Sequence, residues 1–277
     1  MTTSERSAAR VAPPAIRAVA IDLDGTLLDT LSELATAINA MLERLASSEA
    51  TPHAHPDVAQ LLATRSLPEN AVRNMIGKGL ANLVRQALIA AIGHEPSPEL
   101  SSHALGVYQE CYFEILGSTA APYDGVIAGL DRMHTLGLPI ACITNKATRF
   151  TLPLLERTNL GARFQHVVCG DTYERRKPDP MPLLKTAERF GCLPAELLMI
   201  GDSINDVAAA RAAGSPILCV PYGYNEGAPV DKLDCDGMIP DLSEAFAADR
   251  SSIHAHASDR SGIIPSQSSL STGAPSL

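Results

Sequence analysis

Short, largely apolar segments recur along the chain and constrain its fold more than any other feature. They comprise residues 18–21, 138–143, 166–169, 197–200 and 217–220. Stretches in which apolar residues have helical spacing, such as residues 127–136 and 182–190, lie beside the later segments. Apolar strands that alternate with amphipathic helices are typical of a parallel sheet covered by helices on both faces. The pattern therefore predicts an α/β fold with a doubly wound, Rossmann-like parallel sheet.

A long helical interval interrupts this alternation after the first strand. No second strand is expected before about residue 138, whereas helical spacing of apolar residues predicts helices at 31–45, 71–92 and 100–116, the second interrupted at Gly77-Lys78-Gly79. Residues 47–64 are expected to be a long polar loop. We therefore predict a helical cap at residues 30–120, inserted into an α/β catalytic core formed by residues 16–29 and 121–248.

The two ends of the chain have a different composition. Residues 1–15 lack the apolar centre of a signal peptide, and residues 249–277 are rich in Ser, Ala, Gly and Pro without any periodicity. Such segments bury too little apolar surface to offset their ordering entropy. Both are predicted to be disordered, one as an arm and the other as a tail.

Charge and cysteine content exclude several classes of function. The formal net charge of −9 argues against nucleic acid as a partner, because nucleic-acid surfaces need clustered Lys and Arg. No apolar stretch is long enough to span a membrane. The six cysteines are scattered and include no Cys-x-x-Cys pair, which favours free thiols and a cytoplasmic location. The oligomeric state cannot be read from the sequence.

The strongest local signal is the run Asp22-Leu23-Asp24-Gly25-Thr26, directly after the first apolar strand. Ligands in doubly wound sheets bind at the carboxyl ends of the strands, where this run is expected to lie. One carboxylate can attack phosphorus, and the other can act as general acid and base. By itself the run is also compatible with an ordinary acidic strand end.

Three further segments complete the pattern. Thr144-Asn145 follows the next predicted strand and offers donors for a phosphate group, although simple helix capping is the better explanation when the segment is taken alone. Lys177, in Arg-Lys-Pro-Asp-Pro, can neutralise phosphoryl charge. Asp202 and Asp206 follow another strand, and their hard oxygen ligands suit Mg²⁺. The order of these segments is more specific than any one of them.

In that order, the segments resemble the motifs of haloacid dehalogenase superfamily phosphatases with a helical cap, and the resemblance extends from about residue 16 to residue 242. It implies that Asp22 is the nucleophile and a Mg²⁺ ligand, and that Asp24 is the general acid and base and binds the metal through its carbonyl. It further implies that Thr144, Asn145 and Lys177 bind the phosphoryl group, that Asp202 is a metal ligand, and that Asp206 supports this site.

Substrate selection in such an enzyme is expected to lie in the cap. Residues 71–80, 122–126 and 221–227 resemble segments of bacterial phosphoglycolate phosphatases, which implies hydrolysis of the small ester 2-phosphoglycolate to glycolate and phosphate. Lys78 and Arg73 are the cap candidates for its carboxylate, although a solvated helix face would explain either residue.

Two other functions remain open at this stage. A β-phosphoglucomutase-type phosphomutase would share the core residues and a helical cap. A phosphate-binding regulator without turnover would also use the same pocket, but it would have no need of both Asp22 and Asp24.

Overall fold

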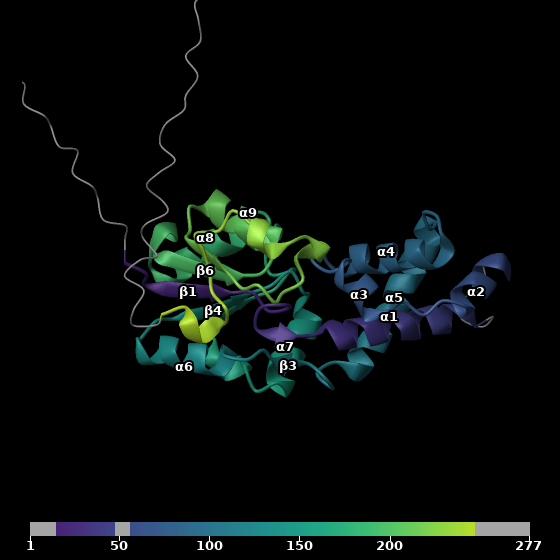
Figure 1. Cartoon of the computed structure of the whole chain (residues 1–277), viewed down its shortest axis with the longest axis horizontal. Helices are drawn as coiled ribbons and strands as arrows, with labels where there is room; N and C mark the ends of the chain where they lie inside the picture. The colour runs from purple at the N-terminus through teal and green to yellow at the C-terminus, as the bar shows by residue number, and fades with distance from the viewer. Residues whose placement is uncertain (1–14, 48–55, 247–277) are drawn as a thin grey trace, which may run out of the picture.

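The computed structural model describes residues 15–47 and 56–246 (Figure 1). The predicted arm, apart from Ala15, and the predicted tail therefore lie outside the described residues. The strands are β1 (Ala18–Ile21), β2 (Leu28–Asp29), β3 (Ala121–Pro122), β4 (Ile140–Ile143), β5 (His166–Val168), β6 (Leu197–Gly201), β7 (Ile217–Cys219) and β8 (Gly237–Met238). The α-helices are α1 (Leu31–Ala46), α2 (Pro56–Ala63), α3 (Glu69–Arg73), α4 (Leu80–Ile92), α5 (Pro98–Ile115), α6 (Val126–Thr135), α7 (Thr148–Arg157), α8 (Met181–Phe190) and α9 (Ile204–Ala213).

A six-stranded sheet in the order β5-β4-β1-β6-β7-β8 forms the centre of the molecule, and each neighbouring pair is parallel. β1 lies inside this sheet, and its four residues are fully buried. Val19 and Ile21 belong to one apolar cluster, whereas Ala18 and Ala20 belong to the other. Alternate side chains of a strand point to opposite faces, so each face of the sheet has its own core.

Helices cover both faces, as expected for a doubly wound fold. α8 and α9 lie on one side of the sheet and α6 and α7 on the other (Figure 1). Leu183 of α8 and Val207 of α9 belong to the cluster that contains Ala18, whereas Leu130 of α6 and Phe150 of α7 belong to the cluster that contains Val19. This arrangement confirms the predicted α/β fold class.

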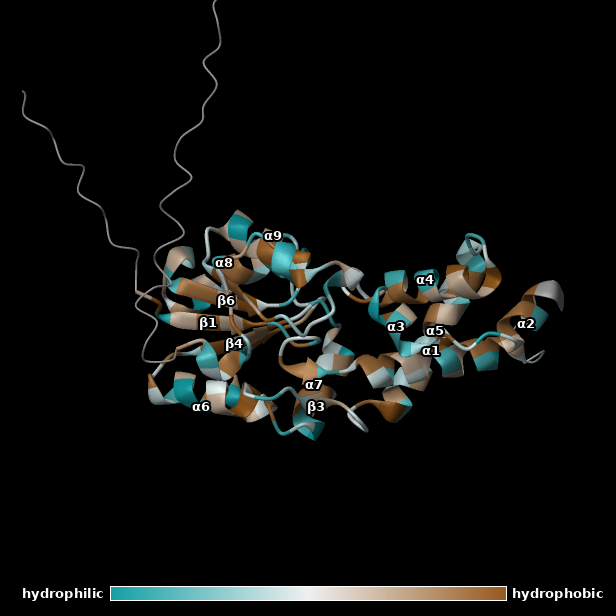
Figure 2. Cartoon of the chain, in the orientation of Figure 1, coloured by the Kyte–Doolittle hydropathy of each residue, from teal (hydrophilic) through white to brown (hydrophobic). Residues whose placement is uncertain are grey.

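A block of helices extends from the sheet at the point where the sequence predicted a cap (Figure 1). In the described part of residues 30–120 it comprises α1 to α5. Leu34, Ile38 and Met41 of α1 are buried there together with Tyr108 and Tyr112 of α5. Figure 2 shows apolar residues along the strands, while each of these helices carries both apolar and polar residues. Among the described helices, none is long and apolar enough to cross a membrane.

Two local expectations were wrong, and one strand was missed. Residues 56–63 of the expected loop form helix α2. β2 and β3, which pair antiparallel at the base of the helical block, interrupt the interval in which no strand was expected. The edge strand β8 was also missed. Each missed strand has only two residues, which is too short for a hydrophobic period to be recognised.

Glu33 ties the beginning of α1 to the segment that returns from α5. Its Oε2 accepts a hydrogen bond from the N–H of Gly117 at 3.0 Å, and its Oε1 accepts from the N–H groups of Thr119 at 2.8 Å and Ala120 at 2.9 Å. Glu33 is only 1% exposed. A buried carboxylate satisfied by three backbone donors therefore fixes the two chain segments that enter and leave the helical block.

Replacing Glu33 by alanine should lower the free energy of unfolding by about 3 kcal/mol, because buried N–H groups lose their acceptor. Urea denaturation would measure this change. Glu43→Ala, at an exposed position of the same helix, is the matched control and should leave the midpoint close to that of the wild type. An equal loss for both variants would contradict the role of Glu33.

Candidate active site

Three neighbouring strands bring the predicted site residues to one edge of the sheet. β1 lies between β4 and β6, and all three run parallel. Asp22 directly follows β1, Thr144 directly follows β4 and Asp202 directly follows β6. Because the carboxyl ends of parallel strands meet at the same edge, the sheet itself brings these residues together.

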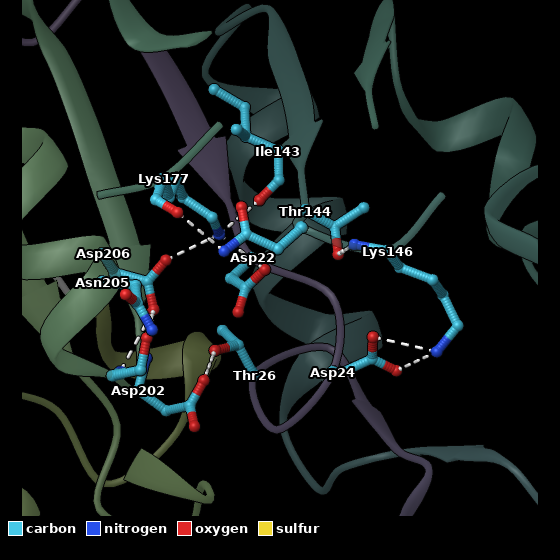
Figure 3. Close-up of polar contacts among 12 residues, drawn as sticks. Asp22, Asp24, Thr26, Ile143, Thr144, Lys146, Lys177, Asp202, Asn205 and Asp206 are labelled. Atoms are coloured by element: carbon cyan, nitrogen blue, oxygen red, sulfur yellow. Dashed lines mark hydrogen bonds and ion pairs between the residues drawn. The ribbon is translucent and has the colours of Figure 1, made fainter. Parts of the chain in front are cut away.

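Lys177 is the central cation of this site (Figure 3). Its Nζ donates to Oδ1 of Asp22 and to Oδ1 of Asp206, both at 2.7 Å, and to the carbonyl oxygen of Ile143 at 2.6 Å. The lysine side chain is 2% exposed. An ammonium group has three N–H donors, so all of them are used within the protein.

Asp206 supports the site from the first turn of α9. Its Oδ2 accepts hydrogen bonds from the hydroxyl of Ser203 at 2.7 Å and from the N–H groups of Ser203 and Asp202 at 3.1 and 3.3 Å. Gly201 permits this close approach, since a Cβ atom there would lie 2.4 Å from Cγ of Asp206. Asp206 therefore holds both the loop after β6 and the ammonium of Lys177.

Asp202 is held by the loops that follow β1 and β7. Its Oδ1 accepts from the hydroxyl of Thr26 at 2.8 Å, and its Oδ2 accepts from the N–H of Tyr224 at 2.6 Å. A Cβ atom would lie 2.7 Å from Oδ2 at Gly25 and 2.2 Å from it at Gly223. Gly25 also has φ of +90°, a backbone conformation that favours glycine. Backbone thus packs directly against this carboxylate.

The buried acids are difficult to ionise without a further positive charge. Burial raises the pKa of Asp22 well above its usual value, although the nearby Lys177 opposes this effect. Burial and the neighbouring Asp206 raise the pKa of Asp202 to about 6. Burial alone would lower the pKa of Lys177, but Asp206 and Asp22 outweigh it, so the lysine remains charged.

The charge and chemistry of this cluster fit a divalent cation. Carboxylate oxygens of Asp22, Asp202 and Asp206 lie within 4.8 Å of one another. Three carboxylates and the single ammonium of Lys177 leave a formal charge of 1 − 3 = −2, which a divalent ion would balance. Asp22 and Asp202 line the cleft above the sheet, whereas Asp206 is not among its lining residues, so Asp22 and Asp202 are the better placed ligands. Hard oxygen donors are the ligands that Mg²⁺ prefers.

Asp24 lies beside this cluster and pairs with a cation that the sequence prediction missed. Nζ of Lys146 is 2.7 Å from Oδ1 and 2.9 Å from Oδ2 of Asp24 (Figure 3). The hydroxyl of Thr30 also donates to Oδ1, at 2.8 Å. Lys146 directly follows Thr144-Asn145, so the sequence could have indicated that it lies near the site. Its pairing with Asp24 could not have been predicted in this way.

Thr144 and Asn145 both line the cleft above the sheet. The hydroxyl of Thr144 accepts from the N–H of Lys146 at 3.1 Å, and its own proton can still be donated to a ligand. Nδ2 of Asn145 donates to the carbonyl oxygens of Lys177 at 2.8 Å and Gly77 at 3.4 Å. The amide of Asn145 thus joins the core to the helical block, and its phosphate-binding role remains a prediction.

The cleft lies between the sheet and the helical block. The helical side is mostly apolar, and the sheet side carries the polar groups. The lining residues are Asp22, Asp24, Leu34, Ile76, Gly77, Gly79, Leu80, Leu83, Thr144, Asn145, Lys146, Lys177, Asp202, Ser203, Asn205, Tyr224 and Asn225.

Neither cap candidate for binding the substrate lines this cleft in the described residues. Arg73 Nη2 donates to the carbonyl oxygens of Tyr222 at 2.7 Å and Gly223 at 2.5 Å, and its guanidinium lies 5.4 Å from the ring centroid of Tyr224. The carbonyl oxygen of Lys78 accepts from Arg176 at 3.4 Å. Arg73 therefore connects the helical block to the loop after β7, and the substrate roles of Arg73 and Lys78 stay predictions.

Comparison with known proteins points to one family. The family described as haloacid dehalogenase-like hydrolase matches residues 16–214. A phosphoglycolate phosphatase of Thiobacillus denitrificans is 46% identical over 84% of this chain and 95% of its own length, and one of Nitrosospira multiformis is 46% identical over 84% and 95%. The crystal structure of a predicted phosphoglycolate phosphatase from Haemophilus somnus has a TM-score of 0.72 at 27% identity, covering 83% of this chain and 96% of that one.

Without a divalent cation, the protein should lose thermal stability as the pH rises from about 4 through about 6. The raised pKa of Asp202 means that the folded state binds the proton more tightly than the unfolded state, so deprotonation favours unfolding. Millimolar Mg²⁺ should therefore raise the unfolding midpoint more at about pH 8 than at about pH 5, where protons compete for the ligands.

Differential scanning fluorimetry with and without Mg²⁺ would measure both effects. Asp202→Asn is the matched variant and should flatten the pH dependence and reduce the Mg²⁺ shift. The absence of any Mg²⁺ shift in the wild-type protein, or an equal shift at both pH values, would contradict a divalent site at these carboxylates.

Proposed function

The chain belongs to the haloacid dehalogenase-like hydrolases, and we propose that it is a Mg²⁺-dependent phosphatase that hydrolyses 2-phosphoglycolate to glycolate and phosphate. The observation that carries this proposal is the placement of Asp22. It lies in the cleft, held by Lys177, with a second acid, Asp24, two residues away in the same cleft. This arrangement suits phosphoryl transfer to a carboxylate, followed by hydrolysis.

In the first step, an oxygen of Asp22 attacks phosphorus in line with the ester bond. The bond between phosphorus and the ester oxygen breaks, Asp24 gives its proton to the leaving oxygen, and glycolate departs. The phosphoryl group remains on Asp22 as an aspartyl-phosphate. Lys177, which engages Oδ1, orients the Asp22 carboxylate and balances negative charge that builds up around it.

In the second step, Asp24 accepts a proton from water as that water attacks the phosphorus. The bond between phosphorus and Asp22 breaks, which releases phosphate and restores the carboxylate. Thr144 and Asn145, which line the cleft, would donate to the phosphoryl oxygens. Asp22, Asp202 and the carbonyl of Asp24 would hold Mg²⁺, which when bound neutralises phosphoryl charge.

The substrate proposal rests on the relatives, which are named phosphoglycolate phosphatases, and on the cleft. Its helical side presents apolar groups such as Leu34, Leu80 and Leu83, while its charged groups lie on the sheet side. A small anionic ester suits a cleft of this kind, because its charged groups can face the sheet side while the apolar side covers it. We propose that residues 30–120 act as a cap that shields the reaction from water, with Arg73 as one of its connections to the core.

The proposal of a cytoplasmic enzyme has separate support. All six cysteines lie in the described residues, and all are free thiols. A reducing compartment maintains that state.

Steady-state phosphate release from a panel of small phosphate esters would test the proposed function. With Mg²⁺, kcat/KM should be highest for 2-phosphoglycolate, and removal of the ion with a chelator should abolish turnover. Asp22→Asn should lower turnover by at least about 10⁴-fold, since an amide cannot replace the carboxylate nucleophile. Substantial phosphate release by this variant would exclude Asp22 as the nucleophile. A clear preference for a sugar phosphate, or phosphoryl transfer between two positions of a sugar, would instead favour the phosphomutase alternative.

Asp24→Asn should lower kcat/KM by about 10²–10⁴-fold for 2-phosphoglycolate, whose alkoxide leaving group needs a proton. The loss should be much smaller for an aryl phosphate such as 4-nitrophenyl phosphate, because its leaving group departs as a stable anion. The ratio kcat/KM is the proper measure, since it reports the step in which the ester bond breaks. Equal losses for both substrates would contradict the acid role of Asp24.

A further inference from the structure

Lys146 is a second buried cation in the cleft, and the proposed chemistry leaves it without a role. Its side chain is 3% exposed, and its ammonium lies 5.1 Å from the ring centroid of Tyr112, which is itself fully buried. Lys177 also lines the cleft, but Asp22, Asp206 and Ile143 occupy its three donors. In the described lining of the cleft, these two lysines are the only cationic side chains.

The pairing of Lys146 with Asp24 engages the acid on both of its oxygens. Lys146 contacts Oδ1 and Oδ2, and the hydroxyl of Thr30 donates to Oδ1. To give a proton to the ester oxygen, Asp24 has to turn toward the substrate and weaken these contacts. A lysine buried against an aromatic ring would then lack a counter-charge, which is strongly unfavourable.

The chemistry of the proposed substrate provides a replacement for that counter-charge. In 2-phosphoglycolate a single CH₂ group separates the carboxylate from the ester oxygen that Asp24 protonates. A cation bonded to Asp24 therefore lies close to the place where this carboxylate has to be when the ester oxygen meets the acid. A substrate without the carboxylate has no anionic group that could pair with Lys146 after Asp24 turns away.

We propose that Lys146 binds the carboxylate of the substrate, which replaces Asp24 as the partner of the lysine. The enzyme would thereby select phosphate esters with a neighbouring anionic group. This inference rests on the proposed function and assigns its specificity to the core of the enzyme. The cap candidates fit less well, because Arg73 donates to the carbonyl oxygens of Tyr222 and Gly223, and neither Arg73 nor Lys78 lines the cleft.

A matched pair of substrates tests this assignment. 2-Phosphoglycolate and 2-hydroxyethyl phosphate have nearly the same size and a similar primary alkoxide leaving group, but only the first has the carboxylate. The quantity to measure is the ratio of their kcat/KM values. A general effect on folding, on Mg²⁺ binding or on Asp24 would change kcat/KM for both substrates and would therefore cancel in the ratio.

In the wild-type enzyme the ratio should strongly favour 2-phosphoglycolate. Lys146→Met, which keeps the length of the side chain but removes the charge, should lower that ratio by on the order of 100-fold. Lys146→Arg, which keeps the charge, should retain most of the preference. Lys185→Met, at a half-exposed surface position paired with Glu188, is the control and should leave the ratio unchanged.

A measurement on the wild-type enzyme covers the case in which Lys146→Met does not fold. Glycolate should inhibit the hydrolysis of 2-hydroxyethyl phosphate at concentrations at which its neutral analogue glycolamide does not. Equal inhibition by the two compounds would overturn the inference.

The remaining outcomes separate the inference from the proposed function. If the wild type prefers 2-phosphoglycolate and Lys146→Met keeps that preference, the inference fails and the proposed function stands. If Lys78→Met or Arg73→Gln lowers the ratio while Lys146→Met does not, the carboxylate site belongs to the cap. If the wild-type enzyme hydrolyses other esters but not 2-phosphoglycolate, the proposed function and the inference fail together.

Discussion

The ammonium of Lys177 is the interaction on which the rest of the site depends. It joins Asp22 after β1, Asp206 at the start of α9 and the carbonyl oxygen of Ile143 at the end of β4. Without it, buried carboxylates would face one another at the edge of the sheet, and their repulsion would oppose both ionisation and close approach. Asp206 then links this cation to Ser203 and the loop that carries Asp202. One lysine thus joins groups from two strands and one helix.

The excess negative charge of the aspartates explains how the site can bind an anionic substrate in a protein whose net charge is −9, because that excess charge favours a bound metal ion. Lys177 leaves two negative charges uncompensated among Asp22, Asp202 and Asp206, which is the complement of a divalent cation. Asp24 and Lys146 form a separate pair beside this cluster. The site is therefore divided into a part suited to the metal and the phosphoryl group, and a part whose cation can exchange one carboxylate for another.

The helical block connects to the site mainly through backbone groups. The carbonyl oxygen of Gly77 accepts weakly from Asn145 and Asn205 at 3.4 Å, and Arg73 reaches the carbonyl oxygens of the loop after β7. Glu33 fixes the base of the block through the N–H groups of the returning segment. Such contacts depend on the path of the backbone more than on the neighbouring side chains, which is why the sequence pattern did not reveal the contacts of Arg73 with Tyr222 and Gly223.

By itself the sequence determined the order of elements and the position of the acids. Continuous apolar strands predicted the parallel sheet, and in such a sheet Asp22, Thr144 and Asp202 have to meet at one edge. Two-residue strands such as β2 and β8 and the short helix α2 were missed, because a short segment contains too few positions to reveal a period. Only the tertiary structure decided which groups pair. Asp24 and Lys146 are 122 positions apart, and a contact between segments so distant depends on packing that no local pattern encodes.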